Sequence, residues 1–233
     1  MNGPTVAPAA PTGLRRMWQP AALPWTGGVA TLLVTFLTAA VLVSSDGTVA
    51  GDSALHTWSL AHRSQTAVSI ARFVTDSGTS VWPYLITFAA GFLTGTTSRL
   101  RLIRGSAALA VLLAGQGIRF VAMSLIARPR PPRSDWATHA SGFSMPSGHT
   151  TTSALAAGLV CWAVTRTAHR TAARCLRITA VGWAVCVALT RIYLGVHWAS
   201  DILAGWLLAV AWLAFLGALL APLERRTVPP AQN

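Results

Sequence analysis

The sequence predicts an all-α membrane protein: a bundle of six transmembrane helices, with an amphipathic interfacial helix between the first two spans. Two features of composition predict this class, since 53% of the 233 residues are hydrophobic and only 10% are charged. Soluble domains carry about a quarter charged residues. The chain also holds 10 Trp but only 2 Tyr, and Trp is enriched where helices meet the membrane surface. The composition therefore favours an integral membrane protein over a water-soluble globule.

The charge pattern indicates membrane topology rather than nucleic-acid binding. The formal net charge is +12, and all 18 positive residues are Arg. Most of these Arg lie in short segments between apolar runs, where they set topology and meet anionic lipid headgroups. We therefore expect a lipid bilayer as a partner, and no nucleic acid. The three cysteines (Cys161, Cys175 and Cys186) show neither a disulfide framework nor the spacing of metal ligands.

The apolar runs divide the chain into spans and tails. We expect a disordered Pro/Ala-rich tail at residues 1–22, a membrane domain at residues 23–223 and a second tail at residues 224–233. Residues 46–76 mix polar and apolar side chains at helical spacing, which predicts one amphipathic helix lying on the membrane. The six predicted spans cover residues 29–44, 80–97, 105–127, 147–165, 178–190 and 202–223.

The fifth span presents a problem of length. Only 13 uncharged residues separate Arg177 from Arg191. They rise about 20 Å, whereas the hydrocarbon core is roughly 30 Å thick. Either Arg177 extends its side chain to the membrane surface, or Arg191 reaches into a polar pocket at the far end.

Six spans place both termini on the same side of the membrane. That side then receives 11 of the 18 Arg, so the positive-inside rule makes it cytoplasmic. The opposite, extracytoplasmic face receives residues 128–147 and 191–201. Their Arg residues run against the topological bias, and a functional role is needed to explain them.

The first motif on that face, Pro146-Ser147-Gly148-His149, opens a helix. We expect Ser147 to cap the helix, and Gly148 lets a ligand approach the backbone closely. The free N–H groups of a helix start favour an anion such as phosphate, with His149 beside it as a proton donor. The alternative is a capped helix with an incidental histidine at the membrane surface.

The second motif joins His197 to Asp201, four residues apart on one helix face. A carboxylate on one imidazole nitrogen fixes the tautomer and leaves the other nitrogen as a base or nucleophile. The guanidinium groups of Arg130 and Arg191 match phosphate oxygens. A structural His–Asp pair is the alternative reading. We expect no metal, because the sequence has no carboxylate cluster and no suitably spaced cysteines.

Together these segments resemble the three-part signature of the type 2 phosphatidic acid phosphatase (PAP2) superfamily. The family motifs are Lys-x6-Arg-Pro, Pro-Ser-Gly-His and Ser-Arg-x5-His-x3-Asp. The chain departs from them twice. Thr190 stands where the family usually has Ser, and Met123 stands where the family has Lys, seven residues before Arg130. Arg119 lies one helical turn before Met123. We expect one of three outcomes: Arg119 supplies the missing charge, Arg128 supplies it, or the activity is reduced or lost.

The resemblance implies a membrane phosphatase that hydrolyses a phosphate ester or diphosphate of a lipid without a cofactor. His197 would form a phosphohistidine, oriented by Asp201, and His149 would protonate the leaving group. Polyprenyl (undecaprenyl) diphosphate is the favoured substrate, with phosphatidate and phosphatidylglycerol phosphate also compatible. Phosphotransfer to another lipid, or a lipid-binding or transport role with weak catalysis, are the alternatives. The oligomeric state stays open. The implied phosphate-binding residues are Arg130, Arg191, Ser147, Gly148 and, as the replacement for Lys, Arg119.

Overall fold

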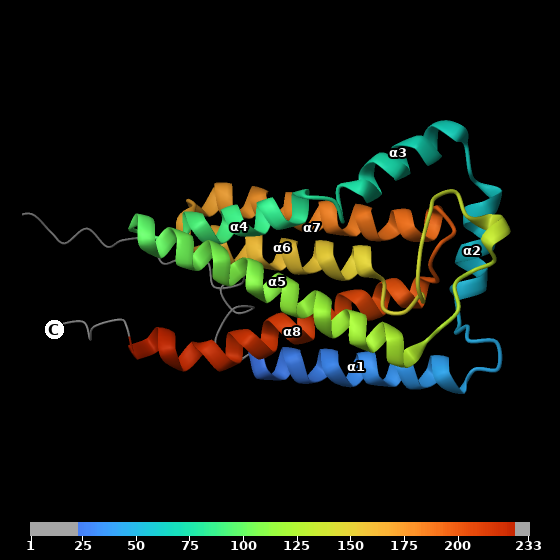
Figure 1. Cartoon of the computed structure of the whole chain (residues 1–233), viewed down its shortest axis with the longest axis horizontal. Helices are drawn as coiled ribbons and strands as arrows, with labels where there is room; N and C mark the ends of the chain where they lie inside the picture. The colour runs from blue at the N-terminus through green and yellow to red at the C-terminus, as the bar shows by residue number, and fades with distance from the viewer. Residues whose placement is uncertain (1–22, 227–233) are drawn as a thin grey trace, which may run out of the picture.

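A computed structural model describes residues 23–226, which form eight α-helices and no strand (Figure 1). The all-α prediction is confirmed for this part of the chain. The predicted tail at residues 1–22 lies outside the described residues, as do residues 227–233. Residues 224–226 were expected to begin the second tail but instead end the last helix. The helices are α1 (Leu23–Val43), α2 (Asp52–Ala61), α3 (Gln65–Asp76), α4 (Trp82–Leu93), α5 (Ser98–Ile126), α6 (Gly148–Thr167), α7 (Arg170–Tyr193) and α8 (Ala199–Arg226).

Four of the described helices are long and apolar enough to cross a membrane: α1, α5, α7 and α8. The helix α4 has only 12 residues and rises about 18 Å. The helix α6 has 20 residues but is built largely from small and hydroxyl side chains. Length and composition thus establish four candidate spans rather than the six that the sequence predicted.

The length problem of the fifth span is resolved by where α7 begins. The helix starts at Arg170, eight residues before the predicted boundary, and its 24 residues rise about 36 Å. The segment 170–177, predicted as a loop, is therefore helical. At the other end Arg191 is 2% exposed and donates a hydrogen bond to the Thr75 hydroxyl at 2.9 Å. Of the two explanations, the polar pocket is confirmed.

The predicted single interfacial helix at residues 46–76 is wrong in number, because two helices form there. The first ends at Ala61, and Ser64 caps the second, its hydroxyl accepting a hydrogen bond from the Ala67 N–H. In α2 the polar residues Asp52 and His56 are buried against protein, whereas Leu55 and Trp58 are exposed. The apolar side of α2 therefore faces outward. At this end of the bundle α2 crosses the helix ends and α3 packs on α7 (Figure 1).

The centre of the bundle is α6, which contacts α4, α5, α7 and α8. Its small residues allow this close approach. A Cβ added to Gly158, for instance, would lie 2.4 Å from Leu213 Cδ1. Leu155, Ala156 and Leu159 of α6 form a core with Leu112 of α5 and Ala209 of α8. Because α6 is covered by protein, it does not need the apolar surface that the outer helices carry.

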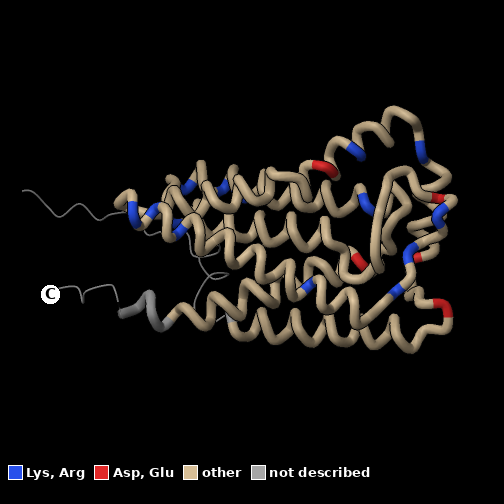
Figure 2. The backbone as a smooth tube through the Cα atoms, in the orientation of Figure 1, with Lys and Arg blue, Asp and Glu red and all other residues tan. Residues whose placement is uncertain are grey.

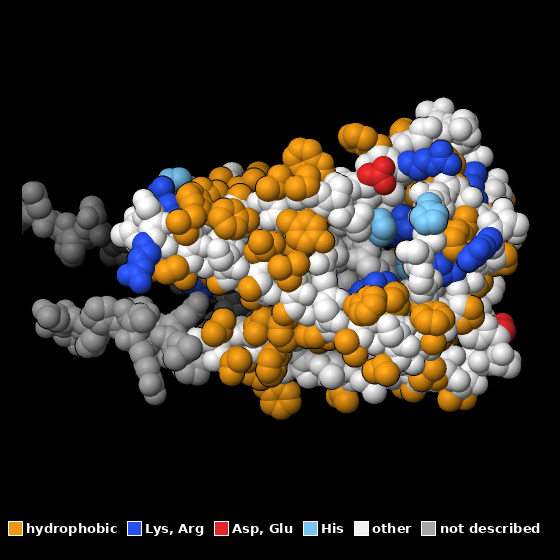
Figure 3. All heavy atoms as spheres, in the orientation of Figure 1, with side chains coloured by type: hydrophobic (Ala, Val, Ile, Leu, Met, Phe, Trp, Pro, Cys, Tyr) orange, Lys and Arg blue, Asp and Glu red, His pale blue; other side chains and the backbone are white. Residues whose placement is uncertain are grey.

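Charged and apolar residues are sorted along the bundle. Figure 2 shows Arg and acidic positions gathered towards the two ends, with a long uncharged middle. Apolar side chains cover the flank, whereas Arg and His side chains surround a hollow near the α3 end (Figure 3). Large apolar residues stay exposed on the outer helices, including Leu32 and Phe36 of α1 and Leu125 of α5. This surface is suited to lipid contact.

Candidate active site

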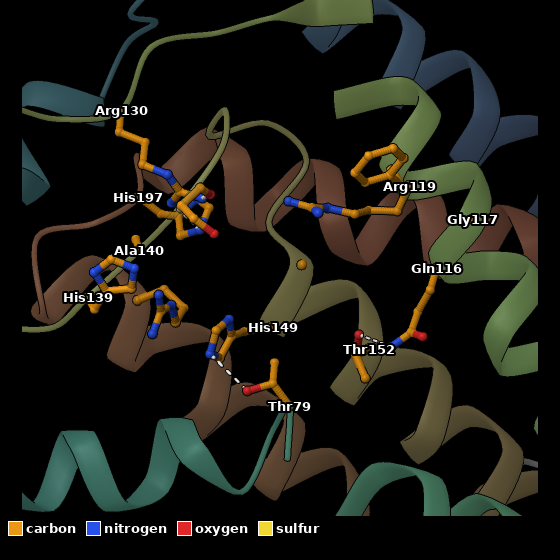
Figure 4. A pocket seen from close by; sticks show the side chains of 14 residues that line it. Thr79, Gln116, Gly117, Arg119, Arg130, His139, Ala140, His149, Thr152 and His197 are labelled. Carbon is orange, nitrogen blue, oxygen red and sulfur yellow. Dashed lines mark hydrogen bonds between the residues drawn. The ribbon is translucent and has the colours of Figure 1, made fainter. Parts of the chain in front are cut away.

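The hollow near the α3 end is a cavity of about 650 Å³. Five separate parts of the chain meet there: the α3–α4 loop, α5, the loop between α5 and α6, the start of α6, and the α7–α8 junction (Figure 4). Both predicted histidines line it, together with three arginines. The polar and glycine residues of the lining are Thr79, Gln116, Gly117, Arg119, Arg130, His139, Ser141, Gly148, His149, Thr152, Arg191 and His197.

His197 lies in the short link between α7 and α8, and both of its ring nitrogens are bonded. Nδ1 lies 3.1 Å from a carboxylate oxygen of Asp201, and Nε2 lies 2.8 Å from Nη1 of Arg130. Since a guanidinium can only donate, Nε2 is the acceptor and Nδ1 carries the proton. Burial, followed by the positive charges of Arg130 and Arg191, lowers the pKa of His197 well below its usual value. The ring is therefore neutral, with a lone pair on Nε2.

Asp201 does not line the cavity but lies behind His197, fully buried. Its position follows from the first turn of α8. The carboxylate, three residues into the helix, accepts a hydrogen bond from the Trp198 N–H at 2.9 Å, as in a capping box. The i,i+4 spacing then brings His197 to the same oxygen.

Arg130 comes from the loop after α5, and all five N–H groups of its guanidinium donate hydrogen bonds to the surrounding protein. Besides His197, it donates to the backbone carbonyls of Val196, Ser141, Gly142 and Phe143 at 2.8–3.0 Å. These bonds hold the loop against the α7–α8 link (Figure 4). Arg130 reaches the predicted site, but in this state it has no donor left for a ligand.

The start of α6 differs from the prediction in one detail. Ser147 occupies the N-cap position, yet its hydroxyl makes no capping bond and is buried without a partner. Its N–H donates instead to the Asp201 carbonyl at 3.1 Å, so Ser147 sits behind the cavity lining. Gly148 and His149 do line the cavity. Nε2 of His149 lies 3.2 Å from the Thr79 hydroxyl (Figure 4).

The charge that Met123 lacks is present at Arg119. Met123 is buried beneath the loop, where its sulfur lies beside Gly142, outside the cavity lining. Arg119 extends from α5 into the cavity, and its Nε donates to the Pro146 carbonyl at 2.7 Å. A Cβ added to Gly148 would lie 3.2 Å from the Arg119 guanidinium carbon. The terminal nitrogens of Arg119 thus lie against the start of α6.

Arg128, the other candidate replacement, points away from this cavity. It is 2% exposed and bonds to two buried carboxylates, those of Asp52 and Asp201. Its guanidinium therefore bonds within the protein interior, and of the two candidates only Arg119 lines the cavity.

Several residues that line the cavity, or that bond to its lining, carry no motif and were missed. Thr75 holds Arg191, and Thr79 holds His149, both from the α3 region. Deeper in the cavity the Gln116 amide donates to Thr152 at 2.9 Å and to Tyr84 at 3.1 Å. A single threonine or glutamine in an apolar sequence gives no signal of its own; only the placement of Arg191 predicted that a polar partner must lie near.

The arrangement combines a neutral, oriented imidazole, a second imidazole and three guanidinium groups around one space. Such a set can bind a phosphate and stabilise the charge that develops during its transfer. Among the described residues, no group of three or more His, Cys, Asp or Glu could hold a metal ion.

Known proteins resemble this chain in sequence and in fold. The model of the PAP2 superfamily matches residues 104–223. An undecaprenyl-diphosphatase from Sulfolobus acidocaldarius is 29% identical over 117 residues, which span 50% of this chain and 48% of that protein. The crystal structure of a transmembrane PAP2-type phosphatidylglycerolphosphate phosphatase from Bacillus subtilis matches with a TM-score of 0.70 and 22% identity, over 89% of this chain and 100% of that one.

The family match takes in the three motif segments that line the cavity. It begins within α5, before Arg119, and ends in α8, beyond Asp201. It also covers more than half of the chain, so the protein belongs to the PAP2 superfamily.

Proposed function

We propose that the protein is an integral membrane phosphatase that hydrolyses a phosphate ester or diphosphate of a lipid through a phosphohistidine. The observation that carries this proposal is the state of His197. Asp201 fixes its protonated nitrogen, and the unprotonated Nε2 accepts a hydrogen bond from Arg130 at the wall of the cavity. An oriented neutral imidazole is a nucleophile, and fixed positive charge is what a phosphoryl transition state requires.

In the first step Nε2 of His197 attacks phosphorus. The N–P bond forms as the bond to the leaving oxygen breaks, and that oxygen takes a proton from His149. The negative charge of a bound phosphate favours the protonated form of the His149 ring. In the second step the now neutral His149 accepts a proton from water. The water oxygen attacks phosphorus, the N–P bond breaks, and inorganic phosphate leaves.

Arg119 and Arg191 are the proposed first contacts of the phosphate. Each makes one hydrogen bond to protein, and Nε of Arg191 is buried without a partner. Arg130 joins them during attack, because a phosphate oxygen is a stronger acceptor than the neutral ring of His197. Gly148 contributes its N–H at the start of α6, with Ser147 supporting that turn.

The favoured substrate is a polyprenyl diphosphate, with phosphatidate and phosphatidylglycerol phosphate as the other candidates. The names of the two relatives support a diphosphate or a phosphate monoester of a lipid. The apolar flank beside the cavity suits a substrate whose chain stays in the membrane (Figure 3).

The proposed topology has residues 23–223 as one phosphatase domain that crosses the membrane six times. The helices α4 and α6 would supply the two spans beyond the four candidates, and α2 and α3 would lie on the extracytoplasmic surface. Both termini would be cytoplasmic and the active site extracytoplasmic. The Arg residues at the bundle end opposite the cavity support this orientation (Figure 2).

The test is a panel of lipid phosphates assayed with the purified protein in detergent and a metal chelator. We expect phosphate release from polyprenyl diphosphate and none after His197→Ala. His62→Ala is the matched control, because His62 is an exposed histidine that stacks on Trp58. Full activity of His197→Ala would overturn the nucleophile assignment.

The same assay separates the alternatives. A labelled lipid product in place of inorganic phosphate would indicate phosphotransfer. Binding of the lipid without turnover would indicate a lipid-binding or transport protein, the role that Met123 favours. Arg119 argues against that role, because it returns a positive charge to the cavity.

A further inference from the structure

A buried ion network lies behind the cavity and joins three distant parts of the chain. Arg128, Asp52 and Asp201 are 2%, 1% and 0% exposed. Nη1 of Arg128 lies 2.5 Å from Asp201, and its Nη2 lies 2.7 Å from Asp52. One guanidinium therefore bridges two carboxylates, one from α2 and one from α8. Asp201 is also the group that orients His197, so the network reaches the proposed nucleophile.

Asp52 is held as firmly as Asp201. It accepts hydrogen bonds from the Ser200 N–H at 2.9 Å, the Ser200 hydroxyl at 2.7 Å and the Val49 N–H at 3.1 Å. Ser200 directly precedes Asp201, and its hydroxyl also accepts a bond from Arg128 at 2.7 Å. Through these bonds α2 is fastened to the first turn of α8, where the orientation of the His197 ring is set.

The charges of the network are unequal, since two carboxylates share one guanidinium. A buried carboxylate without a positive partner is strongly disfavoured, and Arg128 removes that cost for Asp201. Asp52 pairs with the same guanidinium, so the positive charge of Arg128 only partly neutralises Asp201. The Asp201 carboxylate therefore stays negative enough to accept a hydrogen bond from the Nδ1–H group of His197, and this bond makes Nε2 a stronger nucleophile.

We infer that Arg128 and Asp52 are positioning residues of the active site, which act on His197 through Asp201 and do not touch the substrate. This inference rests on the proposed phosphohistidine mechanism. Neither residue lines the cavity. Arg128 also bonds to the Gly47 carbonyl at 2.8 Å, so it is anchored from the α1–α2 link as well. The α2 segment, which carries no family motif in this chain, is on this view part of the catalytic machinery.

The test is a double-mutant cycle measured on lipid phosphate hydrolysis. Asp52→Asn keeps the size of the side chain, and we expect kcat to fall about tenfold with KM and the inhibition constant of inorganic phosphate unchanged. Arg128→Met leaves two buried carboxylates without a cation, and kcat should fall about 10³-fold. The double variant should recover about tenfold over Arg128→Met, because one uncompensated carboxylate remains instead of two.

Arg133→Met is the matched control, because Arg133 is an exposed arginine of the same loop as Arg128. A merely structural role predicts losses of thermal stability and of the amount of active protein, with kcat per folded molecule unchanged in all three variants. That outcome overturns the inference, as does an unchanged kcat for Asp52→Asn. If Asp52→Asn does not fold, Ser200→Ala replaces it, with a smaller loss of kcat at constant KM expected. Full activity of His197→Ala would instead refute the mechanism beneath the inference.

Discussion

The two histidines of the cavity that the motifs predict, His149 and His197, are held in opposite ways. His197 is 1% exposed, and each of its ring nitrogens has a fixed partner. His149 has one hydrogen bond, to a threonine of the α3–α4 loop, and its ring borders open space. A nucleophile gains from a fixed direction of attack, whereas a group that gives a proton to one oxygen and takes it from another gains from freedom. The difference between the two rings fits the two proposed roles.

The arginines divide along the same line. Arg130, beside His197, uses all five N–H groups within the protein, whereas Arg119 uses one. The His197 side of the cavity is thus complete before a ligand arrives, and the Arg119 side is open to receive one. Substitutions on the two sides should therefore change different kinetic constants.

The largest expected effect separates the two histidines. His197→Asn removes the atom that bonds to phosphorus, and kcat should fall by about four orders of magnitude or more. His149→Asn removes a proton donor, and kcat should fall by about two to three orders. Measurement of kcat for phosphate release tests both. Equal losses would contradict the division of roles, and so would a phosphorylated enzyme intermediate in His197→Asn.

The next largest effect concerns the Arg119 side of the cavity, which is open to a ligand. Arg119→Met should lower kcat/KM about 10²-fold, because one of the cations that stabilise the phosphoryl charge is lost. Arg133→Met is the control: Arg133 is exposed and lies over the Trp136 ring, so the change should be less than about twofold. A wild-type kcat/KM for the Arg119→Met variant would show that Arg119 does not replace the Lys that the family has at the position of Met123.

Much of the site was predictable because three motifs carry it. His149, His197, Arg130 and Arg191 were predicted from spacing and residue type, and all four line one cavity. The helical class followed from composition. Helix ends were less predictable. The start of α7 at Arg170 was missed because charged residues were taken to end a span, although Arg is a good helix former.

The contributions of α2 and α3 could not be predicted from sequence. Periodicity in residues 46–76 shows that a helix has two faces, but not which face meets protein and which meets lipid. In α2 the polar face turned out to be buried. The contact of Ser200 with Asp52 joins residues 148 apart, and only tertiary packing brings them together.

A smaller effect tests how closely Arg119 lies against the start of α6. Gly148→Ala places a methyl group 3.2 Å from the guanidinium carbon of Arg119, a tight contact that requires the guanidinium to shift by a few tenths of an ångström. We expect kcat/KM to fall about tenfold as the guanidinium is displaced. In an Arg119→Met background the same substitution should cost little, because the two sites are coupled. Additive losses in the double variant would show that Gly148 acts independently of Arg119.

The smallest effect is on the stability of the folded protein and concerns only the His197 side of the cavity. Burial lowers the pKa of His197 in the folded protein, whereas the unfolded chain has a histidine pKa of about 6.5. Below that pH the unfolded chain binds a proton at His197 and the folded protein does not. The contribution of His197 to the free energy of unfolding is therefore fully present above about pH 6.5 and is lost as the pH falls. The loss is at most about 1.4 kcal/mol per pH unit for this one group.

We therefore expect the thermal midpoint in detergent to be a few degrees lower at pH 5.5 than at pH 7.5. His197→Asn should reduce that difference, and His62→Asn, which changes an exposed ring, should not. A His197→Asn protein with the same pH dependence as the wild type would mean that the buried ring accepts a proton in the folded state. The His197 side of the cavity would then be less different from the Arg119 side than its geometry indicates.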